Sequence, residues 1–380
     1  MNETGSEDES IVFVPEIKPV GVTNERSPKL FEMLSERFSV VGISVSRLNQ
    51  IVYDQRVNKP TRYLLFPLDE GVTFWRTLRA LRQESSALVF AEGSYFSLAS
   101  GFAAKLRQAP MIWDNHGNIV TFAKVQGKSS FFTRGNVLFE KVLERLSTKI
   151  LVVNQKDKED YVSMGFSAHK LEVLPTCADM RVAAERYCTR SEARKKLGIS
   201  EQESVVLFVG TLKYEPNLDA AKYIAQELAP KVRQAFPSAR FYVAGSGSPS
   251  FPYPEGTVFL GFVEDMYLWL SAADVSIAPL WKGLGILTKV IEALSAGKPT
   301  VVTPLAMEGI PELEHQANCL LGKDREDFAD QLARLLKDER LGAELGSEGK
   351  RLIERSYSCE VIAQKLVQIL RMTREAQKSR

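Results

Sequence analysis

The feature that most constrains the fold of this chain is a regular alternation between short apolar runs and longer amphipathic segments. The apolar runs are rich in β-branched residues and end at turn-forming residues, which is typical of buried strands. The amphipathic segments repeat their apolar residues at helical spacing. Parallel strands need long crossover connections, which helices usually supply. The alternation therefore predicts an α/β fold of parallel, doubly wound sheets with helices on both faces.

The first half of the chain carries one such series. The strands that we expect are 11–14, 40–45, 63–66, 87–91, 111–113, 150–153 and 171–174. The helices that we expect are 27–38, 73–83, 95–108, 131–146 and 156–164. The first helix opens with Ser27 and Pro28, a capping residue followed by proline at the first helical position.

A polar stretch at 175–190 interrupts the pattern before a second series begins. Its expected strands are 205–209, 240–244, 257–260, 275–278, 300–302 and 319–321. Its expected helices are 216–236, 265–272, 286–296, 325–337, 341–355 and 360–376. The two series predict a disordered acidic tail at 1–10, a first domain at 11–180, a second domain at 181–358 and a terminal helix at 359–380.

Composition excludes several classes of protein. The 49 Lys and Arg residues nearly balance the 47 Asp and Glu residues, so coating nucleic acid is not the main task of this chain. No apolar run approaches the roughly 20 residues that a membrane-spanning helix needs. The cysteines and histidines are scattered, so we expect neither a disulfide framework nor a zinc site, and the simplest compartment is a reducing cytoplasm.

The most informative motif follows the expected strand 275–278. A loop with Gly283 and Gly285 leads into a helix, and glycines let the backbone approach a ligand closely. The first amides of that helix lack intrahelical partners, so with the helix dipole they favour a phosphate. Lys289 and Glu292 share one helix face; the lysine can neutralise phosphate and the carboxylate can bind a ribose diol. The motif predicts a metal-free clamp for a nucleotide diphosphate.

This segment resembles the donor-binding loop of the family 4 (group 1) glycosyltransferases. Further segments resemble the same family in the same order, namely 114–117, 174–179, 207–220, 241–247, 260–265 and 273–279. The resemblance implies a GT-B fold, in which two Rossmann-like domains face a central cleft and the terminal helix returns toward the first domain. It also implies a retaining transfer of a sugar from a nucleotide-diphosphate donor, without a cofactor or a metal. No Asp-x-Asp motif occurs in the chain.

The resemblance also assigns roles to individual residues. The donor-binding residues that it implies are Gly21, Lys213, Phe262, Val263, Gly283, Gly285, Ile286, Leu287, Thr288 and Glu292. The amides from Gly285 to Thr288 would hold the distal phosphate, and Phe262 and Val263 would lie beside the base. His116 and Lys289 are the expected catalytic residues, and Glu92 is a weaker acceptor-side candidate.

The sequence departs from the family at several charged positions. Leu284 replaces an acidic residue, Leu287 replaces an arginine, and Thr211 and Pro216 stand where many members have Arg and Lys. Two other functions therefore stay open: a nucleotide-sugar epimerase on the same fold, and a non-catalytic protein that binds nucleotides or glycans. The expected acceptors of a transferase are glycans, lipid-linked sugars or other cell-envelope intermediates.

The expected helix 73–83 adds a prediction about location. Arg76, Arg79 and Arg82 recur every three residues, so they lie near one face. Such a face suits a peripheral contact with the inner surface of the cell membrane, although an ordinary solvated face explains the same spacing.

Overall fold

The chain divides into two units. The structure is a computed structural model that describes residues 10–15, 26–43, 59–84, 86–94, 96–115, 117, 129–283 and 287–378. Unit 1 comprises Met1–Pro175 and Ile362–Arg380, and unit 2 comprises Thr176–Val361. The chain passes between the units twice, close to the boundaries after residues 180 and 358 that the sequence predicts.

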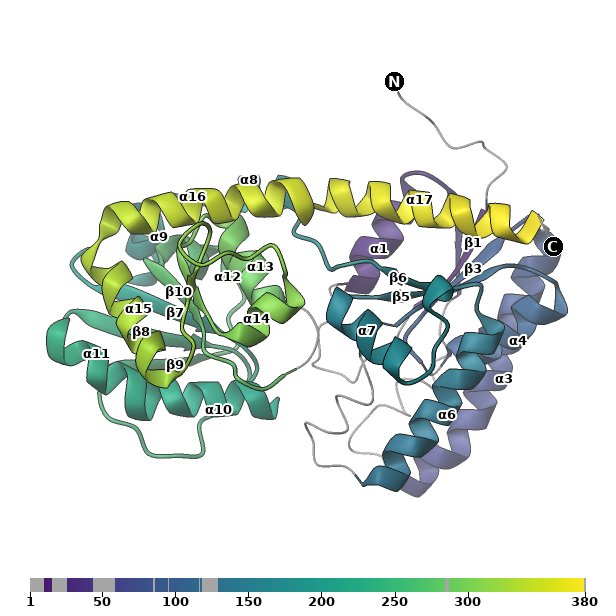
Figure 1. The fold of residues 1–380 in the computed structure, drawn as a ribbon, viewed down its shortest axis with the longest axis horizontal. Helices are drawn as coiled ribbons and strands as arrows, with labels where there is room; N and C mark the ends of the chain where they lie inside the picture. The colour runs from purple at the N-terminus through teal and green to yellow at the C-terminus, as the bar shows by residue number, and fades with distance from the viewer. Residues whose placement is uncertain are drawn as a thin grey trace. The chain divides into compact units, whose positions relative to one another are not determined.

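Unit 1 is built on a parallel sheet. Among its described residues the strand order is β2-β1-β3-β4-β5-β6, and every pairing is parallel. The strands are β1 (Ser10–Val14), β2 (Ser39–Gly42), β3 (Leu88–Glu92), β4 (Met111–Asp114), β5 (Lys149–Val152) and β6 (Leu171–Val173). Every residue of β1, β3 and β4 is buried, because helices cover both faces of the sheet. Figure 1 shows these helices around the strands.

Five described helices of unit 1 connect its strands: α1 (Arg26–Ser35), α3 (Lys59–Gln83), α4 (Ser97–Leu106), α6 (Ser130–Leu146) and α7 (Gln155–Ser163). The last helix of the chain, α17 (Cys359–Lys378), follows unit 2. Helix α17 belongs to this unit from Ile362 onward. Arg374 donates to the Ser10 carbonyl at 3.0 Å, and Gln377 donates to the Gln108 carbonyl at 2.9 Å. These bonds tie the end of the chain to the unit in which the chain begins.

One expected strand of unit 1 is wrong. Residues 63–66 form no strand, because they lie within the long helix α3. A short apolar run fits a buried helix as well as a strand. Pro60, the second residue of α3, is the better signal, since proline is favoured in the first turn of a helix.

Unit 2 contains the second parallel sheet. Its described strand order is β12-β11-β10-β7-β8-β9, again with parallel pairings only. The strands are β7 (Ser204–Val209), β8 (Ala239–Ala244), β9 (Thr257–Gly261), β10 (Val275–Ala278), β11 (Thr300–Val302) and β12 (Leu320–Leu321). The two sheets confirm the expected α/β architecture of two Rossmann-like units.

Helices cover the sheet of unit 2 (Figure 1). They are α8 (Met180–Arg186), α9 (Arg190–Leu197), α10 (Glu215–Tyr223), α11 (Ala229–Ala235), α12 (Met266–Ala272), α13 (Thr288–Ser295), α14 (Pro304–Gly309), α15 (Arg325–Lys337) and α16 (Glu339–Ser356). A π-helical turn at Ile224–Leu228 joins α10 to α11, so the expected helix 216–236 is one helical stretch with a wide turn. The turn precedes Pro230, which has no amide hydrogen to donate.

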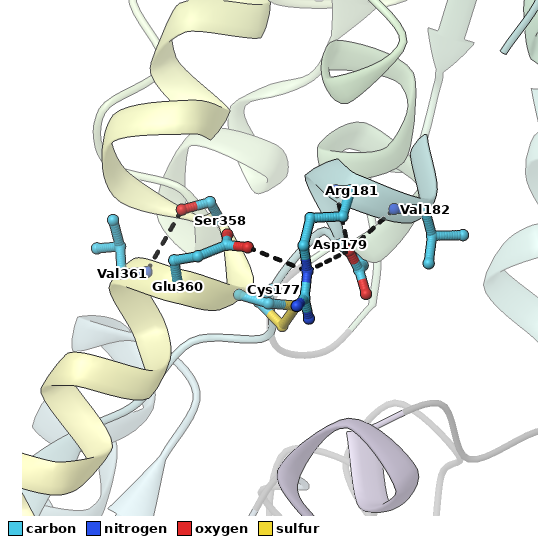
Figure 2. Close-up of a disulfide and its surroundings, with 8 residues drawn as sticks. Cys177, Asp179, Arg181, Val182, Ser358, Glu360 and Val361 are labelled. Atoms are coloured by element: carbon cyan, nitrogen blue, oxygen red, sulfur yellow. Dashed lines mark hydrogen bonds and ion pairs between the residues drawn. A yellow bond between two sulfur atoms is a disulfide. The ribbon is translucent and has the colours of Figure 1, made fainter. Parts of the chain in front are cut away.

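A disulfide joins the two segments at which the chain enters and leaves unit 2. Cys177 and Cys359 are bonded, with their Cα atoms 5.0 Å apart. The segments also pair through their backbones, because Ala178 donates to the Tyr357 carbonyl at 2.9 Å and Cys359 donates to the Ala178 carbonyl at 3.0 Å. Figure 2 shows Arg181 between Asp179 and Glu360 beside this bond.

The expectation that the scattered cysteines form no disulfide framework did not anticipate this one bond. Cys177 and Cys359 are separated by 182 positions, so spacing in the sequence gives no sign that they meet. The other two cysteines, Cys188 and Cys319, are free thiols. In the part of the chain that the structure describes, no helix is both long enough and apolar enough to cross a bilayer.

Candidate functional site

The candidate site of unit 2 lies at the edge where its parallel strands end. The loop after β10 leads to α13, which begins at Thr288 rather than at 286. Leu287 is the N-cap residue, and its apolar side chain cannot cap the first amides of the helix. The first turn of α13 has no acidic residue, and Thr288 is exposed. The start of α13 is therefore suited to an anion, as the sequence predicts.

Two residues of the expected clamp, Gly285 and Ile286, lie outside the described residues, as does Leu284 between the two glycines. Gly283 is described, and a Cβ atom added there would lie 3.2 Å from Cδ2 of Leu305 and 3.8 Å from the hydroxyl oxygen of Tyr214. The loop after β10 thus passes close to Tyr214, the N-cap residue of α10.

Lys289 points into the protein rather than along the surface. Its amino group donates to Oδ1 of Asn217 at 2.7 Å and lies 4.3 Å from the centre of the Phe208 ring. Burial of the amino group lowers the pKa of Lys289 to about 7, and the negative charge of Glu292 opposes this shift. Whether Lys289 touches a phosphate stays a prediction.

Glu292 follows Lys289 by one turn of α13. Its side chain is half-buried, and its backbone carbonyl accepts from the Tyr187 hydroxyl at 3.3 Å and from the Ser295 hydroxyl at 2.8 Å. These bonds fix the helix at the position of the carboxylate. The half-buried carboxylate can accept hydrogen bonds from a diol, the role that the resemblance implies for it.

The loops after β7 and β8 pack tightly against each other. Leu212 donates to the Ser246 carbonyl at 2.8 Å, and the hydroxyls of Thr211 and Ser246 lie 2.7 Å apart. A Cβ atom at Gly245 would lie 2.1 Å from the Gly210 carbonyl oxygen, so only glycine allows this approach. Lys213 follows on this loop with an exposed side chain, where it can reach an anion in solvent.

An exposed aromatic ring follows β9. Phe262 has 71% of its surface exposed, and Val263 is half-buried. The ends of β7, β8, β9 and β10 lie at one edge of the sheet, since these strands are parallel neighbours. An exposed ring at this edge can stack on a flat ligand such as a nucleobase.

The sheet of unit 1 has its own cluster at the carboxyl ends of β3 and β4. Glu92 and Asp114 are register partners, and both are buried. Arg26 binds Asp114 through two bonds of 2.9 and 2.8 Å, and Ser27 donates to Glu92. These bonds hold the start of α1 against the strand ends. Glu92, the weaker acceptor-side candidate, is thus a buried partner of α1.

A second network lies beside this cluster. Tyr161 donates to Glu140 at 3.0 Å, Ser94 donates to Glu140 at 3.4 Å, and the Asn115 amide donates to the Tyr161 hydroxyl at 2.6 Å. Burial raises the pKa of Glu140 to about 7, against the bonds from Tyr161 and Ser94. No motif in the sequence indicates Glu140 or Tyr161, which lie on helices α6 and α7.

Two expected site residues of unit 1 are outside the described residues. They are Gly21 and His116. Asn115 directly precedes His116, so the Glu140 network fixes the backbone up to that position. Among the described side chains, no three His, Cys, Asp or Glu residues gather as they would around a metal ion.

Solved structures identify the class of fold. The Anabaena protein HepE in complex with UDP is similar to this chain with a TM-score of 0.70 and 15% sequence identity, over 96% of this chain and 100% of HepE. HepE has also been solved in complex with UDP-glucose. The similarity shows that this chain has the GT-B fold of glycosyltransferases.

Sequence comparisons identify the family. A model described as Glycosyltransferase Family 4 matches residues 32–182, and a model described as Glycosyl transferases group 1 matches residues 203–338. The chain therefore belongs to the family 4, group 1 glycosyltransferases. This finding confirms the family and the fold that the sequence motifs indicate.

Two curated relatives agree with this assignment. An uncharacterized glycosyltransferase of Methanocaldococcus jannaschii is 27% identical over 258 residues, which is 61% of this chain and 63% of that protein. A GDP-mannose-dependent monoacylated α-(1-6)-phosphatidylinositol monomannoside mannosyltransferase of Corynebacterium glutamicum is 25% identical over 304 residues, 74% of this chain and 75% of that protein.

Proposed function

We propose that this protein is a retaining glycosyltransferase that moves a sugar from a nucleotide-diphosphate donor to a glycan or lipid-linked acceptor of the cell envelope. The observation that carries the proposal is the start of α13. An apolar N-cap residue leaves its first amides uncapped, and Glu292 follows one turn later at the same sheet edge. Two other functions must be excluded by the test below: a nucleotide-sugar epimerase, and a binding protein without turnover.

The donor has a matching contact for each of its parts. The amides of Leu287 and Thr288 and the dipole of α13 bind the distal phosphate, and exposed Lys213 adds a positive charge. Glu292 accepts bonds from the ribose hydroxyls. The Phe262 ring stacks on the base. HepE, a protein of the same fold, binds UDP and UDP-glucose, which supports this class of donor.

The transfer breaks one bond and makes another on the same face of the sugar. The bond between the anomeric carbon and the donor oxygen breaks, and that oxygen leaves with the diphosphate. The acceptor hydroxyl bonds to the anomeric carbon, and its proton passes to the departing phosphate. The protein contributes positioning and stabilisation of the charge on the leaving group. The α13 amides and Lys213 supply that stabilisation, and His116 is the proposed contact to the sugar in unit 1.

The proposed reaction needs no metal and no cofactor. The sequence has no Asp-x-Asp motif, and the anion site of α13 supplies the positive potential that a metal would otherwise supply. Turnover should survive EDTA. Loss of turnover on chelation, with recovery on adding magnesium or manganese, would contradict the metal-free clamp.

A panel of nucleotide sugars tests the function. UDP-, GDP- and ADP-sugars are each incubated with the protein, and both nucleotide release and sugar identity are measured. A transferase releases nucleotide diphosphate slowly, and an acceptor glycan accelerates the release. Conversion of the donor sugar into its epimer would favour the epimerase. A thermal shift without turnover would favour the binding protein.

Peripheral membrane contact is part of the same proposal. Helix α3 exposes Leu68, Trp75, Arg79 and Arg82, whose spacing places them along one face. An exposed tryptophan with neighbouring arginines fits an anionic lipid surface, where each basic residue contributes about 1 kcal/mol. A lipid-linked acceptor would make this contact useful.

Sedimentation with vesicles tests the membrane contact. The protein should bind vesicles that contain anionic lipid at low salt, and binding should fall as salt rises, because salt screens the charges. Replacing Arg79 and Arg82 by Gln should weaken it. Binding that ignores salt, or no binding to anionic vesicles at all, would contradict an electrostatic contact.

A further inference from the structure

The contacts of Lys289 indicate how this residue acts in the donor site, an inference that rests on the proposed function. Its amino group has a buried polar partner, Oδ1 of Asn217 at 2.7 Å. It also lies above the Phe208 ring, at 4.3 Å from the ring centre. These contacts hold the side chain against the strand β7 and the first turn of α10, within unit 2.

Asn217 also contacts the loop after β7. Its Nδ2 atom donates to the Thr211 carbonyl at 3.0 Å. A Cβ atom at Gly210 would lie 2.7 Å from Cγ of Asn217, so the absence of a side chain at Gly210 is what admits the amide. Asn217 is 7% exposed, so water does not replace these bonds easily.

The loop held in this way borders the proposed donor site on two sides. Its backbone pairs with the loop after β8 through Leu212 and Ser246, at 2.8 Å. Tyr214 at its end lies beside Gly283 of the loop after β10. Lys213, an exposed cation of the site, lies between these two contacts. A change in the Asn217 contacts would therefore move Lys213.

We propose that Asn217 and Lys289 are positioning residues for the donor. Lys289 anchors Asn217, Asn217 fixes the loop Gly210–Tyr214, and this loop places Lys213 and its own backbone against the bound diphosphate. Lys289 then affects donor binding through Asn217 rather than by touching the phosphate. Asn217 becomes a member of the donor site; it lies in the segment 207–220 that resembles the family, but the sequence assigned it no role.

A double-mutant cycle separates this role from direct contact. Affinity for UDP, GDP and ADP is measured by calorimetry for wild type, Lys289→Met, Asn217→Ala and the double variant. Each single change should weaken the best of the three nucleotides about five- to tenfold, and the double variant should bind no worse than the weaker single variant. Lys222→Met, an exposed lysine of α10, is the matched control and should bind as wild type.

The opposite pattern would overturn the proposal. If Lys289 touches the phosphate directly, Asn217→Ala leaves the affinity unchanged while Lys289→Met loses it, or the two losses add. Asn217→Asp is a second variant, for the case that Asn217→Ala misfolds. It keeps an acceptor for Lys289, but it places a carboxylate oxygen where the Asn217 amide donates to the Thr211 carbonyl. It should weaken nucleotide binding and raise KM for the sugar donor more than it lowers kcat. Wild-type affinity in Asn217→Asp would also overturn the proposal.

The same measurements distinguish a failure of the positioning role from a failure of the proposed function. If wild type binds none of the three nucleoside diphosphates, the donor site itself is refuted. If wild type binds one of them and both single variants bind it equally well, only the positioning role is refuted.

Discussion

At the scale of the residue, Glu292 is the side chain whose role can be tested most directly. Glu292→Gln should weaken donor binding by about 1.5–3 kcal/mol, because an amide loses the charge-assisted bonds to the ribose hydroxyls. Calorimetric titration with the nucleotide that binds wild type measures the loss. Glu354→Gln, an exposed glutamate of α16, is the control. Equal donor affinity in Glu292→Gln and wild type would remove Glu292 from the site.

Glu140 makes the stability of unit 1 depend on pH. Its pKa rises from 4.5 to about 7 on folding, so the folded protein binds more protons than the unfolded chain between these values. The free energy of unfolding should therefore fall as pH rises from about 4.5 to about 7, by about 3 kcal/mol from this residue. Glu140→Gln stays neutral and should lose that dependence.

Urea unfolding at pH 5 and pH 7.5 measures this effect. Wild type and the control Glu159→Gln, an exposed glutamate of α7, should lose stability across the interval more steeply than Glu140→Gln. The same slope in Glu140→Gln and wild type would show that Glu140 titrates normally.

At the scale of the element, the sequence predicted strands better than it predicted loops and side-chain directions. The expected strands 275–278 and 300–302 agree with β10 and β11 at both ends, because both are short, β-branched and bounded by turn formers. The strand predicted at 63–66 was wrong because a short apolar run fits the period of a helix as well as that of a strand. Spacing placed Lys289 and Glu292 on one helix face, but it could not show that the lysine points inward to Asn217 of α10 and Phe208 of β7, since these contacts form only when the three elements pack.

The loop after β8 carries a prediction at this scale. Gly245→Ala places a Cβ atom 2.1 Å from the Gly210 carbonyl oxygen, so the backbones of the two loops must separate. Overpacking of this kind costs about 1–3 kcal/mol and should also weaken nucleotide binding, since both loops border the donor site. Thermal unfolding and nucleotide titration measure the two effects. Gly342→Ala, where the nearest atom is 3.6 Å away, should not destabilise the protein; equal behaviour of the two variants would contradict this account.

At the scale of the whole molecule, the order of the segments explains the architecture. In each sheet the order of the strands reverses direction once, between β1 and β3 in unit 1 and between β7 and β10 in unit 2. The described candidate residues lie near the carboxyl ends of the strands, where such folds bind ligands. The sequence showed this arrangement because the strands and helices alternate twice. It could not show that segments 182 positions apart meet at Cys177 and Cys359, because that contact arises only when unit 2 is folded.

The disulfide should make the stability of unit 2 depend on redox conditions. Cys177 and Cys359 close a loop with a sequence separation of 182, which contains nearly all of unit 2. Closing so long a loop restricts the unfolded chain and stabilises the folded unit by roughly 5 kcal/mol in the chain-entropy model. A reducing agent should lower the unfolding midpoint of wild type and leave that of a Cys177→Ala, Cys359→Ala double variant unchanged.

The backbone bonds of Ala178 should keep the reduced thiols close, so oxidation by a small disulfide such as oxidised glutathione should restore the midpoint. Cys188→Ala, which leaves the pair intact, should respond to reductant as wild type does. If mass analysis shows that both thiols are reduced and the unfolding midpoint of wild type is unchanged, the disulfide does not stabilise unit 2.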